Sequence, residues 1–214
     1  MGGWVLVIPV KRLAVAKSRL AEFAGGQRAD LALAFAADTL AAALSSPEVL
    51  GIAVVTDDEA VAAMARAQGC LAVPDEPDAG LNQALAHGAA VAQDHWHGSA
   101  VAALSGDLPS LRPAELTAAL RAAGVAASAF VADADGHGTT LLTAATPAAF
   151  APRFGSGSAA AHRRGGAVEL TGLDVPSLRR DVDTPADLLV AQALGLGPRT
   201  RAVLGALQGG RHGS

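Results

Sequence analysis

The chain has 214 residues, of which 51% are hydrophobic and 17% charged, a balance that suits one globular α/β domain of ordinary size and excludes a disordered chain. Because 16 Lys and Arg residues face 20 Asp and Glu residues, the formal net charge of −4 argues against a nucleic acid or a membrane surface as a partner. Cys70 is the only cysteine and cannot form an internal disulfide, so we expect a reducing, cytoplasmic location. The longest early apolar run, residues 4–10, is too short to cross a bilayer.

Strand-like and helix-like segments alternate in the first half of the chain. The first apolar run is continuous, as is typical of a strand buried on both faces of a parallel sheet. Asp57 and Asp58 are expected to cap the second helix. The predicted order is β-α-β-α-β, over residues 4–9, 30–44, 51–56, 57–68 and 70–73.

The alternation continues in the second half of the chain. Helices are predicted over residues 81–94, 113–123, 158–164 and 184–194, and strands over residues 99–104, 129–132, 139–143 and 168–170. This pattern predicts a mainly parallel sheet that is covered by helices on both faces. We expect one domain over residues 1–204 and a flexible, glycine-rich tail over residues 205–214.

A basic loop directly follows the first predicted strand. It carries Lys11, Arg12, Lys17 and Arg19, and its two lysines are the only lysines of the chain. Ligands of open α/β sheets bind at the carboxyl ends of strands, so four cations in this place suit a polyphosphate. A solvated basic loop is the alternative, and the residues alone do not decide between the two.

Acidic side chains occur in two further segments. Asp107 follows a predicted strand, in the sequence LSGDLPSL, while Asp181 and Asp183 stand two residues apart in RRDVDTP. Residues two apart on an extended segment point to the same side. Carboxylate oxygens in such places are suited to a hard divalent cation. The alternatives are a turn residue for Asp107 and a helix cap at Asp183 or Thr184.

Glycine and hydroxyl residues mark two later segments. Thr139 and Thr140 follow a Gly-punctuated turn, and Gly155 to Ser158 form a Gly/Ser turn at the start of a predicted helix. Such turns bind anions through backbone N–H groups or simply cap a helix. The glycine spacing at residues 155–160 is not a dinucleotide-binding fingerprint, because no strand precedes it.

Six segments together carry a resemblance to a known family. In chain order they are PVKRLAVAKSRL, GLNQAL, LSGDLPSL, DGHGTTLL, FGSGSAAAH and RRDVDTPADL, and they span nearly the whole chain. This set resembles the phosphoenolpyruvate or 2-phospho-L-lactate guanylyltransferases of deazaflavin coenzyme F-420 biosynthesis. LSGDLP is shared with molybdenum-cofactor and sugar nucleotidyltransferases, whereas FGSGSAAAH together with RRDVDTPADL is particular to this family.

The resemblance implies a fold, a reaction and a set of site residues. The fold is a single Rossmann-like α/β domain of the nucleotide-diphospho-sugar-transferase type. The reaction is transfer of GMP from GTP to phosphoenolpyruvate or 2-phospho-L-lactate, with release of pyrophosphate, and the downstream transferase that consumes the product is a further implied partner. By similarity, the catalytic residues are Asp107 and Lys17, the Mg²⁺ ligands are Asp107, Asp181 and Asp183, the nucleotide-binding residues are Lys11, Lys17, Arg19 and Asn82, and the acceptor-binding residues are Thr140, Gly155 and Ser158.

Two other functions remain open from the sequence. One is a nucleotidyltransferase of the same fold that acts on molybdopterin or a sugar phosphate, although a pterin needs a wider cleft than the turn at residues 155–158 suggests. The other is a non-catalytic GTP-binding regulator. The presence of all three carboxylates argues against a regulator, because GTP binding alone does not require them.

Overall fold

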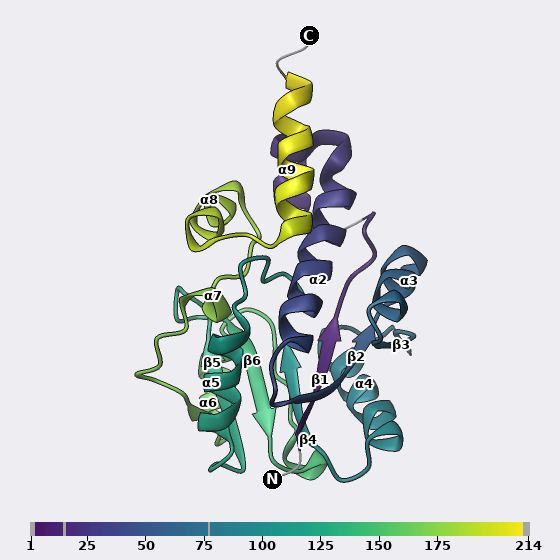
Figure 1. Ribbon diagram of the computed structural model, residues 1–214. Coiled ribbons are helices and arrows are strands. Elements are labelled where there is room, and N and C mark those ends of the chain that lie inside the picture. Colours follow the sequence, from purple (N-terminus) through teal and green to yellow (C-terminus); the bar gives the residue numbers. More distant parts are fainter. Residues whose placement is uncertain (1–2, 15, 77, 212–214) are drawn as a thin grey trace.

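A central sheet organises the molecule in the computed structural model, which describes residues 3–14, 16–76 and 78–211 (Figure 1). These residues form seven strands in the order β3-β2-β1-β4-β6-β5-β7. Strand β6 runs antiparallel to both of its neighbours, β4 and β5, and the other pairs are parallel. The mainly parallel sheet flanked by helices that the sequence predicts is therefore confirmed.

Each predicted strand and helix is present, with ends within two residues of the expected ones. The strands are β1 (Trp4–Pro9), β2 (Val49–Val55), β3 (Leu71–Val73), β4 (Ala100–Leu104), β5 (Ser128–Ala132), β6 (Thr139–Ala144) and β7 (Val168–Glu169). The α-helices are α1 (Ala21–Ala24), α2 (Arg28–Leu44), α3 (Glu59–Ala67), α4 (Leu81–His95), α5 (Pro113–Ala123), α6 (Ser158–Arg164), α7 (Pro176–Arg179), α8 (Pro185–Leu194) and α9 (Pro198–Arg211). Three short 3-10 helices are η1 (Ser18–Leu20), η2 (Gly25–Gln27) and η3 (Pro147–Ala149).

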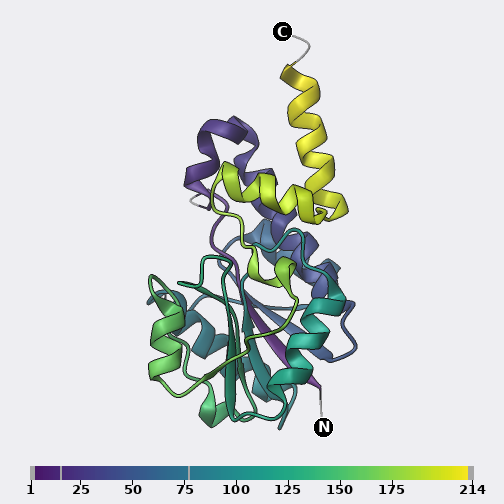
Figure 2. The same cartoon turned by 90° about the vertical axis from the view of Figure 1, so that its left-hand side faces the viewer.

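Strand β1 is buried on both faces, which explains its unbroken apolar sequence. Leu6 and Ile8 point into a core that α2, α3, α5 and α7 cover, whereas Val5 and Val7 point into a second core under α4 and α6. Figure 2 shows these two helical layers on opposite sides of the sheet. The sheet is thus the middle layer of a three-layer α/β/α domain.

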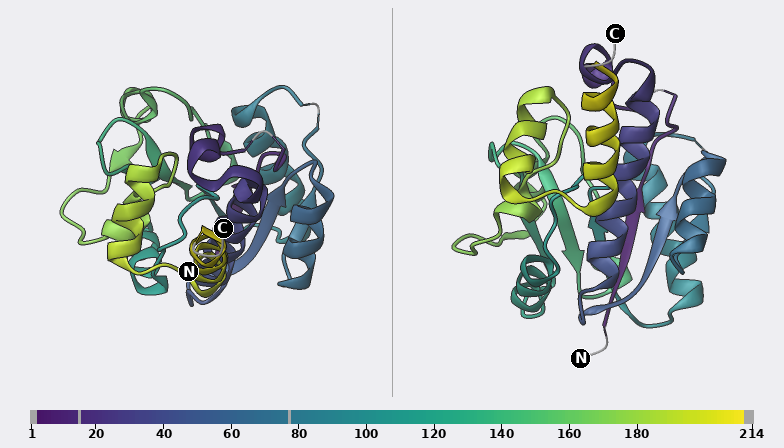
Figure 3. Two further views of the ribbon diagram at one scale, coloured as in Figure 1. Left: turned by 90° about the horizontal axis from the view of Figure 1, so that it is seen from above. Right: turned by 45° about the horizontal axis from the view of Figure 1, so that its top comes forward.

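Helix α9 extends into the stretch from Gly205 onward, where the sequence predicts a flexible tail. Residues 205–211 form the second half of this helix, and residues 212–214 lie outside the described part of the chain. The helix packs along α2, as the right-hand view of Figure 3 shows, and it buries Thr200 and Leu204. Packing against α2 stabilises this helix although its glycine-rich second half has a weak intrinsic helix propensity.

A buried carboxylate of α2 caps the start of α9. Asp38 is only 4% exposed, and it accepts hydrogen bonds from the backbone N–H groups of Arg199 (3.1 Å) and Thr200 (2.8 Å). Gly197 passes so close to this carboxylate that any side chain at position 197 would collide with it. The negative charge also lies at the positive end of the helix dipole, so Asp38 holds α9 in place by both effects.

Replacing Asp38 should therefore release α9. We expect Asp38→Ala to lower the free energy of unfolding by about 1–2 kcal/mol, because two N–H groups lose their cap. Asp38→Asn keeps one carbonyl acceptor and should lose less. Chemical denaturation measures the stability, and amide exchange over residues 199–204 localises the effect. Wild-type exchange at these amides in Asp38→Ala would show that the cap is not needed.

Candidate active site

A cleft with a volume of about 660 Å³ lies at the carboxyl ends of the parallel strands. Because β6 is antiparallel to β4, the start of β6 reaches this cleft together with the ends of β1 and β4. Eight of the residues expected in the site from the sequence line it: Lys11, Lys17, Arg19, Asp107, Gly155, Ser158, Asp181 and Asp183. The location agrees with the general position of ligand sites in open α/β sheets.

The extended segment before α8 brings two carboxylates beside Asp107. The N–H group of Val182 donates to the carbonyl oxygen of Asp107 (3.1 Å). The Val182 side chain is fully buried in a core cluster, so the flanking Asp181 and Asp183 point the other way, into the cleft. The helix cap that the sequence left open is Thr184, which accepts from the N–H group of Asp187.

Lys17 forms ion pairs with Asp107 and Asp183. Its ammonium group donates to Oδ2 of Asp107 and to Oδ1 of Asp183, the latter at 2.7 Å, and its side chain is only 11% exposed. Burial lowers the pKa of Lys17, but the charges of Asp107 and Asp183 outweigh burial, so the net pKa lies above its ordinary value. Lys17 is therefore a half-buried, charged residue held by two carboxylates, and the solvated-loop alternative does not describe it.

Two contacts hold the basic loop in the shape that delivers Lys17. The guanidinium group of Arg28 donates to the carbonyl oxygens of Ala14 (2.6 Å) and Ala16. Oδ2 of Asp58 accepts from the N–H group of Leu13 (2.8 Å), in addition to capping α3 through its other oxygen. No local pattern in the sequence indicates that the Arg28 side chain reaches back to the loop.

The end of β4 lies tightly against the end of β1. A Cβ atom at Gly106 would lie 3.0 Å from the carbonyl oxygen of Pro9 and 3.1 Å from Cγ2 of Val10. Glycine at this place lets the turn that carries Asp107 approach the loop that carries Lys17. The short motif around Asp107 thus has a packing reason as well as a chemical one.

The carboxyl group of Asp181 has a strongly raised pKa. Burial raises its pKa, the nearby charges of Asp107 and Asp183 raise it further, and Lys17 partly opposes them, which together place the pKa at about 7. When all three carboxylates are ionised, they carry more negative charge than Lys17 neutralises. Such an oxygen-rich, electron-rich donor set fits a hard divalent cation such as Mg²⁺.

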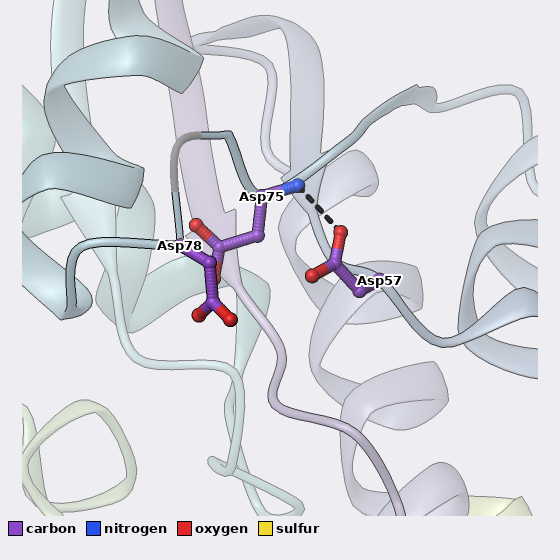
Figure 4. A group of neighbouring side chains, drawn as sticks. All are labelled: Asp57, Asp75 and Asp78. Carbon is purple, nitrogen blue, oxygen red and sulfur yellow. Dashed lines mark hydrogen bonds between the residues drawn. The ribbon is translucent and has the colours of Figure 1, made fainter.

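A separate group of acidic residues lies at the ends of β2 and β3 (Figure 4). One ligand oxygen from each of Asp57, Asp75 and Asp78 lies within 4.8 Å of the others, a condition that Asp107, Asp181 and Asp183 do not meet in this conformation. Asp57 accepts from the N–H group of Asp75 (3.0 Å) and from the guanidinium group of Arg12 (3.1 Å). Arg12 thus forms an ion pair with Asp57 of this group, and it does not line the cleft.

The turn at residues 155–157 offers free backbone donors. Gly155 and Gly157 adopt positive φ angles of 127° and 70°. Among the described residues, nothing accepts from the N–H groups of residues 155–157, whereas those of Ser158 and Ala159 donate to the carbonyl oxygens of Gly155 and His137. The anion-binding turn expected from the sequence therefore has its available N–H groups before Ser158, and Ser158 would contribute its hydroxyl.

Two expected site residues, Asn82 and Thr140, do not line the cleft. The side-chain amide of Asn82 donates to the carbonyl oxygen of Phe154 (3.0 Å) and accepts from its N–H group (2.7 Å). Asn82 thus ties the start of α4 to the acceptor-side turn, and its contact with a base stays a prediction. Thr140 is fully buried and its hydroxyl has no partner among the described residues, while its neighbour Thr139 lines the cleft.

His162 is buried beneath this turn. Its ring lies between those of Phe130 (5.9 Å between centroids) and Phe154 (5.2 Å). Its Nδ1 is 2.9 Å from Oγ1 of Thr139, and its Nε2 accepts from the N–H group of Arg153 (2.9 Å). Burial and the charge of Arg153 lower the pKa of His162 to about 4, so the ring is neutral at neutral pH.

His162 should therefore contribute stability that is lost in mild acid. His162 has a pKa of about 4 in the folded state against 6.5 when unfolded, so between these values only the unfolded state takes up the proton. The contribution of His162 to the free energy of unfolding is complete above pH 6.5 and is lost as the pH drops toward 4, by about 3 kcal/mol in total. Asp181, whose pKa is raised, acts in the opposite direction over this range, so the test compares each variant with the wild type at the same pH. In urea denaturation, the difference in free energy of unfolding between the wild type and His162→Gln should change by about this amount between pH 6.5 and pH 4. The exposed His97 supplies a control, because His97→Gln should keep the full dependence. Equal slopes in all three proteins would contradict the assignment.

In the described part of the chain, no helix is both long and apolar enough to span a membrane.

Solved structures that share this architecture include nucleotidyltransferases. A nucleotidyl transferase from Methanothermobacter aligns with a TM-score of 0.65 and 19% identity, over 91% of this chain and 98% of the other. A 4-diphosphocytidyl-2C-methyl-D-erythritol synthase aligns with a TM-score of 0.61 and 14% identity, over 91% and 99%. At such identities the likeness concerns the fold, which is that of the nucleotide-diphospho-sugar transferases.

Closer relatives identify the family. The profile described as "Guanylyl transferase CofC like" matches residues 4–208. A phosphoenolpyruvate guanylyltransferase from Thermomonospora curvata is 57% identical over 94% of this chain and 88% of its own length. One from Streptomyces coelicolor is also 57% identical, over 94% of this chain and 95% of its own length. The protein is a nucleotidyltransferase, and it belongs to the CofC-like guanylyl transferase family.

Proposed function

We propose that this protein transfers GMP from GTP to phosphoenolpyruvate and releases pyrophosphate, as a step of coenzyme F-420 biosynthesis. The observation that carries the proposal is that one cleft is lined by Lys17, by three carboxylates and by the turn of residues 155–157, whose N–H groups have no acceptor among the described residues. The names of the relatives, which are phosphoenolpyruvate guanylyltransferases, support the same reaction.

The chemistry asks the protein to bring two polyanions together. A phosphate oxygen of the acceptor attacks the α-phosphorus of GTP, the bond to the β-phosphate breaks, and pyrophosphate leaves. The second pKa of a phosphate monoester is about 6, so the nucleophile is already ionised near neutral pH and needs no general base. The protein must instead offset charge repulsion and hold the reacting groups in line, and Lys11, Lys17 and Arg19 supply the cations for this task.

Mg²⁺ completes the proposed charge balance. Asp107, Asp181 and Asp183 would hold it, and it would supply positive charge to the phosphates. Since Lys17 bridges Asp107 and Asp183 in this structure, a cation shared by the carboxylates would free the Lys17 ammonium to contact the triphosphate.

The acceptor is proposed to be phosphoenolpyruvate, with 2-phospho-L-lactate as the alternative. Both carry a carboxylate and a phosphate, so the donors of residues 155–158 can hold the carboxylate end of either. The two differ at the central carbon, which is planar in the first and tetrahedral in the second. A small apolar pocket converts such a difference into about 1–3 kcal/mol, so kinetics must decide.

The direct test is release of pyrophosphate from GTP and Mg²⁺ with phosphoenolpyruvate, 2-phospho-L-lactate or 3-phosphoglycerate. We expect the highest kcat/KM with phosphoenolpyruvate, and the nucleotidylated product should appear in equal amount to pyrophosphate. Binding of GTP without pyrophosphate release with any acid would indicate a regulator instead. Activity only with molybdopterin or a sugar phosphate would indicate a different transferase of the same fold.

Lys17 should be needed for use of GTP. We expect Lys17→Met to lower kcat/KM for GTP by at least about 10-fold, because a charge-assisted contact to the triphosphate is lost. The matched control is Arg12→Met, which removes another cation of the same loop whose side chain is paired with Asp57 and does not line the cleft. Equal kinetics in the two variants would contradict a role for Lys17 in binding the nucleotide.

Replacing Asp181 should raise the stability of the metal-free protein and lower its activity. Asp181→Asn removes one of three like charges, so in EDTA at pH 8 we expect it to raise the melting temperature. The same change removes a proposed metal ligand and should lower kcat strongly while raising the Mg²⁺ concentration needed for half-maximal rate. Wild-type Mg²⁺ dependence in both Asp181→Asn and Asp183→Asn would refute the metal assignment.

A further inference from the structure

The hydrogen bonds around His162 determine which of its ring nitrogens carries the proton. The backbone N–H group of Arg153 can only donate, so Nε2, which lies 2.9 Å from it, must present its lone pair. A neutral imidazole with a free Nε2 has its hydrogen on Nδ1. Nδ1 therefore donates to Oγ1 of Thr139, which lies 2.9 Å away.

This tautomer determines what the Thr139 hydroxyl can do. Its oxygen accepts from His162, and its own hydrogen is left to donate elsewhere. No other hydrogen bond of this hydroxyl exists among the described residues, although the Thr139 residue is only 7% exposed. Thr139 lines the cleft, so this hydrogen is free to donate to a ligand bound there.

The Thr139 hydroxyl belongs to the same side of the cleft as the Gly/Ser turn. The N–H group of Ala159 donates to the carbonyl oxygen of His137 (3.1 Å), which joins the start of α6 to the residues that precede β6. His162 adds a second connection, since it contacts both Thr139 and the backbone of Arg153. The free N–H groups of residues 155–157 and the Thr139 hydroxyl thus form one set of donors, held together by buried contacts.

We propose that the Thr139 hydroxyl binds an oxygen of the anionic acceptor acid, and that His162 is the positioning residue that makes this hydroxyl a donor toward the cleft. This inference rests on the proposed function for the identity of the acceptor. It assigns the contact to Thr139 in addition to Thr140, the residue that the sequence resemblance indicated. It also gives a reason for the buried histidine in the FGSGSAAAH segment.

Valine replacements separate binding from packing, because valine has nearly the shape of threonine without the hydroxyl. We expect Thr139→Val to weaken binding of phosphoenolpyruvate by about 10-fold or more, measured by calorimetry with Mg²⁺, and to raise its KM in step while GTP binding is unchanged. Thr139→Ser keeps the hydroxyl and should stay within about 3-fold of the wild type.

Strand β6 also supplies a matched control. Thr143 is a buried threonine whose hydroxyl donates to the carbonyl oxygen of Ala129 (3.0 Å), and it does not line the cleft. Thr143→Val should lower the melting temperature without changing the affinity for phosphoenolpyruvate. Unchanged affinity in Thr139→Val, or equal losses for phosphoenolpyruvate and GTP in both valine variants, would overturn the proposal.

The role of His162 has a readout that needs no activity. Nitrogen NMR of the wild-type protein should show a protonated Nδ1 and an unprotonated Nε2 at pH 7, and the opposite tautomer would overturn the positioning role. In a His162→Phe background, the penalty of Thr139→Val on phosphoenolpyruvate binding should shrink, because the hydroxyl is no longer fixed as a donor. Binding of phosphoenolpyruvate without turnover would contradict the proposed function alone, whereas no binding to the wild type would contradict both.

Discussion

The ammonium group of Lys17 is the contact on which the geometry of the cleft depends. It is paired with Asp107 and Asp183, and the charges of these two carboxylates raise the pKa of Asp181. These residues come from the loop after β1, the turn after β4 and the segment before α8, so one cation joins three distant parts of the chain. Without it, the segments would meet as three like charges in a half-buried place, which is unfavourable.

Backbone packing places these charges before any ligand arrives. Val182 is buried and bonded to the backbone of Asp107, Gly106 allows the turn to approach β1, and Arg28 holds the basic loop through its carbonyl oxygens. The charged groups therefore have little freedom to move apart, and folding offsets the electrostatic free energy of bringing them together. Such preorganisation is what electrostatic stabilisation of a transferring phosphoryl group requires.

Much of the fold was predictable because its signals are local. Continuous apolar runs identified the strands, and the alternation in Asp181, Val182 and Asp183 indicated correctly that both carboxylates share a side. Two other contacts were not predictable, because each joins residues that no local pattern relates. They are the cap that Asp38 provides for α9 and the hydrogen bonds from Arg28 to the basic loop. The Lys17 ion pairs were not predictable for the same reason, and neither were the hydrogen bonds between Asn82 and the Phe154 backbone.

The reversed direction of β6 has a consequence for how this kind of protein can change. Since β6 enters at the cleft, the hairpin of residues 133–138 and the turn at residues 155–158 lie beside each other and come from one short stretch of chain. The basic loop that precedes η1 and the turn after β4 come from the earlier part. The segments proposed to hold the acceptor therefore lie within residues 133–158, whereas the basic loop and the turn around Asp107 lie outside this stretch. Substitutions at the hairpin and the turn can thus alter acceptor preference while the residues proposed to hold the nucleotide stay the same, which suits evolution or laboratory redesign.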